Sequence, residues 1–94
     1  MLVSLAMYDA PALRGASDLL YEVWREHMLA RDLSAPSALC WDEDLSEVWR
    51  HPQLLAAQTC GFPFVTGACG DAQLIVTPCY DAPGCSGPYY RSVL

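Results

Sequence analysis

The chain has 94 residues, of which 53% are apolar and 17% charged, and its formal net charge is −6. This length fits one small domain, and the apolar content excludes a disordered or collagen-like chain. The five basic residues are all arginines scattered along the sequence, which excludes the clustered basic face of a nucleic-acid-binding protein. No apolar run approaches the roughly 18 residues of a transmembrane helix.

The first predicted element is a strand over residues 2–7, an apolar run that ends at Tyr8 and Asp9. No basic residue precedes this run, which predicts that it is not an export signal and that the chain as given stays in the cytoplasm. Pro11 is typical of a helix's first turn, and a helix is expected from there to about Arg31. Its apolar residues recur at steps of three and four, which predicts one buried face. The members of this face are Leu13, Ala16, Leu20, Val23, Trp24 and His27.

Strands and short helices alternate in the middle of the predicted structure. Residues 38–41 are a short apolar segment typical of a strand. A short helix capped by Asp42 or Asp44 follows, and a His-Pro pair ends it. Residues 54–60 predict a buried strand, and Gly61 opens another short helix or turn.

The last third of the sequence predicts a strand over residues 74–77, a Gly/Pro-rich loop over 81–88 and the start of another strand over 89–94. Because the apolar run continues to the last residue, we expect a single, partial α/β domain over residues 1–94. Its unpaired apolar surface predicts packing against a missing part, or self-association. The five cysteines lack C-x-x-C spacing, which favours buried free thiols over a metal or redox motif.

Polar and aromatic residues follow three of the predicted strands. The alternation of strands and helices predicts an α/β fold with a mainly parallel sheet flanked by helices, in which ligands bind beyond the carboxyl ends of the strands. An amide, a hydroxyl, an accessible glycine backbone and the first N–H groups of a helix can hold a small oxyanion with neutral donors. The candidate binding residues are Tyr8, Gln58, Thr59, Cys60, Gly61 and Tyr80.

Each candidate also has a purely structural interpretation, which stays open at this point. Gln58 and Thr59 can cap the end of a strand and the start of a helix. The two tyrosines can be rim residues, and Cys60 can be a small packed side chain. Neither a cofactor nor a metal is predicted.

Four blocks of the sequence carry a resemblance to a known family. They are M-Y-D at residues 7–9, W-D at 41–42, Q-T-C-G-F-P at 58–63 and Y-Y-R-S-V at 89–93. In this order and spacing, over the whole chain, they resemble the N-terminal part of substrate-binding proteins of phosphate/phosphonate ABC transporters, which have the type 2 periplasmic-binding-protein fold. The resemblance implies most of the first lobe of a two-lobe clamshell, with the second lobe absent. It also implies a small oxyanion such as phosphate or phosphonate as the ligand.

The resemblance further implies a partner and a location. A full-length form would work with an ABC permease, without a cofactor and without turnover, and an exported form would be periplasmic. The alternative functions are a periplasmic-binding-like enzyme and a sensory domain, each acting in the cytoplasm. An enzyme would need Cys60, His27 or a carboxylate to converge on one pocket.

Overall fold

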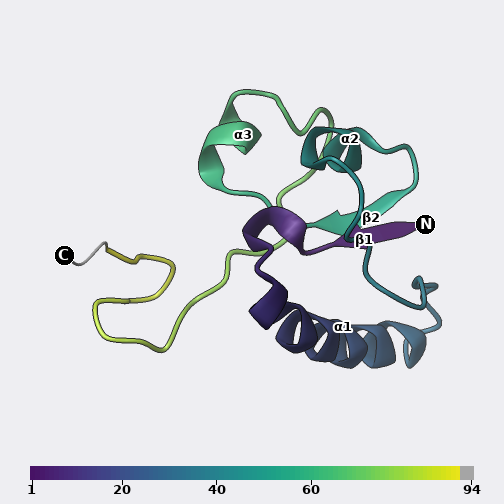
Figure 1. Cartoon of the computed structure of the whole chain (residues 1–94), viewed down its shortest axis with the longest axis horizontal. Coiled ribbons are helices and arrows are strands. Elements are labelled where there is room, and N and C mark those ends of the chain that lie inside the picture. Colours follow the sequence, from purple (N-terminus) through teal and green to yellow (C-terminus); the bar gives the residue numbers. More distant parts are fainter. Residues whose placement is uncertain (92–94) are drawn as a thin grey trace.

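Two short parallel strands, β1 (Leu2–Ser4) and β2 (Leu54–Ala57), lie at the centre of the computed structural model, which describes residues 1–91 (Figure 1). Leu2 pairs with Leu54, and the register then shifts so that Val3 pairs with Ala56. The expected mixed α/β class with a parallel sheet is therefore confirmed. Within residues 1–91 the sheet has two strands, fewer than the sequence predicts.

Helices lie on both sides of this sheet in Figure 1, with α1 (Arg14–Leu29) below it and α2 (Leu45–Arg50) and α3 (Gly61–Val65) above. Two single turns of 3-10 helix, η1 (Ala6–Tyr8) and η2 (Pro11–Leu13), connect β1 to α1. The expected helix thus starts with a 3-10 turn at its proline. Of the two candidate caps of α2, the structure uses Asp44, whose carboxylate accepts from the Ser46 N–H at 2.8 Å.

The first strand is shorter than the predicted residues 2–7. The Ser4 hydroxyl is buried and accepts from the Ala6 N–H at 3.3 Å, a local side-chain bond that competes with the strand ladder. The backbone therefore turns into η1, and Tyr8 follows the strand through a helical turn.

The core joins β1, α1 and the segment before α2. Val3, Tyr21 and Leu39 are buried against one another, and Met28 and Trp41 pack around them. The Tyr21 hydroxyl donates to the Pro36 carbonyl oxygen at 2.7 Å, so this buried phenol has its partner.

The predicted buried face of α1 is wrong by about one residue, a rotation of about 100° around the helix. Leu20 and Val23 are 48% and 51% exposed, whereas Tyr21 is 2% exposed. Polar bonding explains the difference, because the Arg25 guanidinium also donates to the Pro36 carbonyl, at 3.0 Å. These two donors turn the Tyr21 side of the helix inward. The residues that line this inner side, all at least half-buried, are Arg14, Ser17, Tyr21, Arg25 and Met28.

The predicted strand over residues 38–41 does not form. One backbone bond joins this segment to the sheet, from the Cys40 N–H to the Val3 carbonyl oxygen at 2.8 Å. The preceding Pro36 is held at α1, and the segment therefore meets β1 at one point instead of along a ladder. Leu39 is nevertheless buried, as its apolar character predicts.

The predicted strand over residues 74–77 is also absent from the structure. It belongs to residues 73–91, here called the C-terminal arm, which extends away from the helices and the sheet in Figure 1. A strand needs a hydrogen-bonded neighbour, and none of the backbone groups of 74–77 has one within residues 1–91. Of the predicted strand over 89–94, Tyr89 forms only an isolated antiparallel bridge with Ser86, and residues 92–94 lie outside the described residues.

Candidate functional site

The segments that follow β1 and β2 leave the sheet at the same edge, because the two strands are parallel. The Gln58 N–H donates to the Ser4 carbonyl oxygen at 3.0 Å, which ties the two strand ends together. Tyr8 continues from β1 through η1, and residues 58–61 continue from β2 into α3. We call these two segments the strand-end edge.

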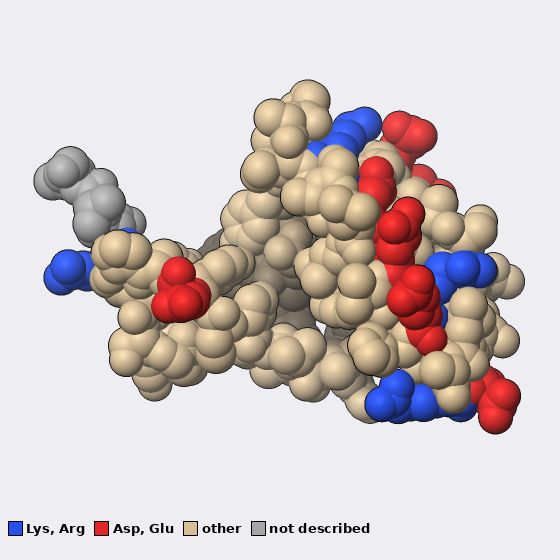
Figure 2. Space-filling view, turned by 90° about the horizontal axis from the view of Figure 1, so that it is seen from below, with Lys and Arg blue, Asp and Glu red and all other residues tan. Residues whose placement is uncertain are grey.

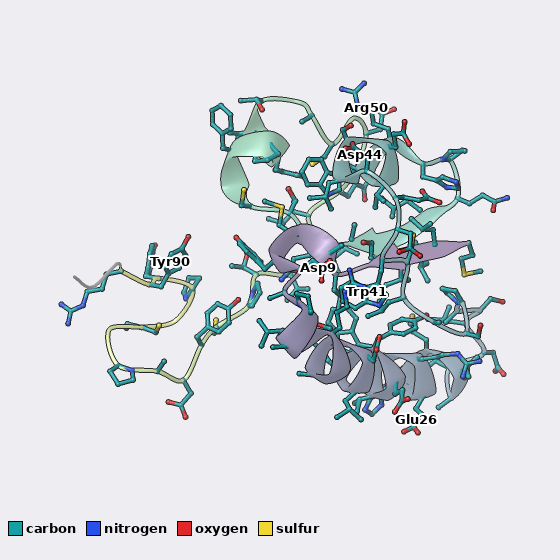
Figure 3. The ribbon with its side chains drawn as sticks, viewed as in Figure 1. Asp9, Glu26, Trp41, Asp44, Arg50 and Tyr90 are labelled. Carbon is teal, nitrogen blue, oxygen red and sulfur yellow. The ribbon has the colours of Figure 1, made fainter. Side chains whose placement is uncertain are left out.

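The Tyr8 side chain lies near two other candidate residues. It is exposed, and local desolvation raises the pKa of its hydroxyl, with further contributions from the nearby ionisable groups of Cys60, Tyr90 and Tyr80. Cys60 and Tyr80 therefore lie close enough to Tyr8 for their charged forms to affect its hydroxyl, although Tyr80 comes from the C-terminal arm and not from a strand end. Tyr90, which sequence reasoning did not select, joins the same group and is labelled on the arm in Figure 3.

Gln58 and Thr59 hold the turn between β2 and α3. The Gln58 carbonyl oxygen accepts from the Trp49 indole N–H at 3.1 Å. The Thr59 hydroxyl donates to the Cys60 carbonyl oxygen at 3.1 Å and accepts from the buried Cys69 thiol at 3.6 Å. Gln58 has no side-chain hydrogen bond within residues 1–91, so its amide is free to meet a ligand, whereas the Thr59 hydroxyl already serves a structural role.

Cys60 and Gly61 mark the start of α3. Cys60 is the N-cap residue and makes no side-chain cap bond, so the first N–H groups of this short helix take no bond from it. A Cβ added at Gly61 would meet nothing within 4 Å, which means that the backbone here faces open space. A small molecule can approach this backbone without displacing protein atoms.

Two surface hollows lie away from the strand-end edge. One is lined by His27, Met28, Arg31 and Leu33, at the end of α1. The other, about 530 Å³, lies beside α2 and includes Arg50 and His51. No candidate binding residue lines either hollow. His27 lines the first hollow, and Cys60 lines neither of the two.

An ion pair that sequence reasoning missed fixes the segment after Tyr8. The Arg14 guanidinium donates to both Asp9 carboxylate oxygens, at 2.8 and 2.5 Å. This pairing lowers the pKa of Asp9 and raises that of Arg14. The Arg14 Cζ also lies 5.1 Å from the centroid of the Trp41 ring, and Figure 3 shows Asp9 and Trp41 close to each other between α1 and the sheet. A spacing of five residues across a proline is not a regular helical pair, so the pattern gave no signal.

Two arginine side chains of the described residues are already held by other groups of the chain. Arg14 is engaged by Asp9, and the Arg50 guanidinium donates to the Gly67 and Ala68 carbonyl oxygens. On the face drawn in Figure 2 the arginine side chains lie apart from one another, and most of the acidic side chains gather over the body of the molecule, although the arm also carries an acidic patch. Within residues 1–91, no group of three or more His, Cys, Asp or Glu side chains is placed to hold a metal ion.

Among the helices of residues 1–91, none is both long enough and apolar enough to cross a bilayer. Comparison with protein-family models, with curated proteins and with solved structures gives no match to this chain.

Proposed function

We propose that this chain is the substrate-binding part of an ABC transporter and that it binds a small oxyanion, such as phosphate or a phosphonate, at the strand-end edge. The proposal follows the sequence resemblance to the first lobe of a type 2 periplasmic binding protein. In a full-length form the partner would be an ABC permease, and a second lobe would close over the ligand.

One observation carries the proposal, which is the parallel pairing of β1 with β2. This pairing supports a shared site because the segments after both strands start from one edge of the sheet. Tyr8 offers a hydroxyl there, and Gln58 offers an amide without another side-chain partner. Neutral donors of this kind suit an oxyanion in a chain whose net charge is −6.

The alternatives from the sequence are an enzyme or a sensory domain in the cytoplasm. An enzyme would consume its ligand, and its turnover would depend on Cys60, His27 or a carboxylate converging on one pocket. A sensory domain would bind an oxyanion without a permease. A binding assay that also follows chemical change in the anion separates the enzyme from the two binding functions.

Thermal melts of the purified chain with phosphate, phosphite and methylphosphonate test the proposal. An anion that binds only the folded state stabilises it by RT ln(1 + L/Kd), where L is the free anion concentration, so we expect one of them to raise the melting temperature. Gln58→Ala removes the free amide and should abolish the rise. Gln73→Ala makes the same change on the exposed arm and should leave the rise intact.

The outcome that rejects the proposal is a melting temperature that none of the three anions changes. A rise that survives in Gln58→Ala also rejects it, since the anion would then bind away from the strand-end edge.

A further inference from the structure

Residues 74–76 are the most exposed run of aliphatic side chains in the described chain. Leu74, Ile75 and Val76 are 67%, 77% and 66% exposed. Their backbone N–H and C=O groups have no hydrogen-bond partner within residues 1–91. β-Branched side chains favour an extended, paired backbone, so this segment has the composition of a strand without a neighbouring strand.

The sheet offers an unpaired edge that matches this segment. β2 pairs with β1 on one side, and no other strand within residues 1–91 lies on its second side. Natural edge strands are usually protected by a charge, a proline or a covering element. β2 has the sequence Leu-Leu-Ala-Ala, with neither a charge nor a proline, and Leu55 is partly exposed.

We propose that the chain forms a dimer in which residues 74–76 of each copy add as a strand to the open edge of β2 in the other copy. The exchange is reciprocal, so it forms a closed two-fold assembly and not a fibre. Both segments are uncharged, and the acidic residues Asp71 and Asp81 flank the strand without lying in it. This proposal does not rest on the proposed function, because it needs no anion.

Hydrogen bonding selects the edge of β2 over the exposed apolar face of α1. Covering residues 74–76 against α1 would bury their side chains, but their backbone groups would lose water and gain no partner. A strand edge supplies the backbone partners and the apolar cover together, as in other cases of strand addition. The second copy is therefore expected at β2 and not at Leu19 or Leu20 on α1.

The arm exposes further large apolar and aromatic side chains beside the exchanged strand. Six large side chains on each arm are more than half exposed, and an aromatic side chain alone covers 150–250 Å². The three aliphatic side chains would be covered in the exchanged strand itself, and the three tyrosines follow it on the same arm. The six are Leu74, Ile75, Val76, Tyr80, Tyr89 and Tyr90.

Sedimentation velocity of the full chain over about 1 to 200 µM tests the dimer directly, with a matched pair of lysine substitutions as the comparison. We expect a reversible monomer–dimer equilibrium for the unchanged chain. Ile75→Lys places a charge in the exchanged strand and should weaken dimerisation at least tenfold. Leu19→Lys places the same charge on the exposed face of α1 and should leave the dimer unchanged. Neither side chain is buried in the protomer, so neither variant should lose its fold.

Hydrogen exchange provides a second readout that does not depend on the variants. The amides of residues 74–76 should be protected at dimer concentrations and exchange freely on dilution. A chain that stays monomeric throughout the range overturns the proposal, as does growth beyond the dimer. A dimer that Leu19→Lys disrupts and Ile75→Lys does not also overturns it, since α1 would then be the interface.

Discussion

Arg14 and Asp9 form a bidentate ion pair that joins the first turn of α1 to the segment directly after η1, with N–O distances of 2.8 and 2.5 Å. The same guanidinium lies over the ring of Trp41, so a single side chain contacts two other segments of the chain. Since Asp9 follows Tyr8 in the sequence, this ion pair holds the backbone that carries Tyr8 to the strand-end edge.

Replacing Asp9 by asparagine should cause a small loss of stability that depends on pH. The pairing with Arg14 lowers the pKa of Asp9 below its unfolded value of about 3.9. Its stabilising contribution is therefore present above about pH 4 and is lost as the pH falls through the lowered pKa. We expect Asp9→Asn to melt a few degrees below the unchanged chain at neutral pH, and the difference to shrink as the pH falls through the lowered pKa of Asp9.

Circular-dichroism melts across this pH range measure the difference. Asp81→Asn is the control, because Asp81 lies on the exposed arm and makes no hydrogen bond within residues 1–91. A deficit of Asp9→Asn that stays constant down to pH 2 would show that the ion pair is not its cause.

Removal of the α2 cap should lower the melting temperature by several degrees. The Asp44 carboxylate accepts from both the backbone N–H and the hydroxyl of Ser46, and these bonds lower its pKa. Asp44→Ala loses the acceptor, whereas Asp44→Asn keeps an oxygen in the same place and should retain most of the stability. Melting curves of the two variants measure this difference. Equal decreases in the melting temperature of both variants would contradict the capping role of Asp44.

The Tyr21 hydroxyl should contribute about 1 kcal/mol to the free energy of unfolding. It is buried and donates to the Pro36 carbonyl oxygen at 2.7 Å, so Tyr21→Phe removes one satisfied hydrogen bond without leaving a cavity. Urea unfolding curves measure the loss. Tyr89→Phe removes the same atom from an exposed ring and should be neutral. A neutral result for Tyr21→Phe would argue that α1 is turned differently.

The orientation of α1 can be checked from its other side as well. Leu20 is half exposed in the structure, so Leu20→Gln should change the free energy of unfolding by no more than about 0.5 kcal/mol. If the face predicted from the apolar spacing were the buried one, the same substitution would cost about 2 kcal/mol or more. Urea unfolding of this single variant distinguishes the two orientations.

The sequence predicted those elements whose signals are local. Asp44 has a capping side chain, and Pro11 fits a first helical turn. The sequence of β2 is an uninterrupted apolar run that contains neither a charged residue nor a proline. Each of these features lies within a few residues of the element that it determines. The predictions of a mixed α/β chain, of α2 with its cap and of the start of α3 at Gly61 are confirmed for this reason.

The features that depend on distant partners were not predictable in the same way. The buried face of α1 is set by Pro36, which lies 15 residues beyond Tyr21. The strand expected over residues 74–77 needs a neighbour that no local pattern specifies. In the candidate site, Cys60 lies near Tyr8 because the two strands that lead to them are parallel. The influence of Tyr90 on the pKa of Tyr8 depends instead on the course of the C-terminal arm, which no local pattern specifies.

The most direct test of the proposed oxyanion site is a phosphate titration of the isotope-labelled chain, followed through its backbone amide NMR signals. We expect saturable shifts confined to the strand-end edge, at Tyr8 and residues 58–61, and we expect Gln58→Ala to remove them. Shifts that gather instead around Arg50 and His51, or signals that do not change with phosphate, would contradict the account.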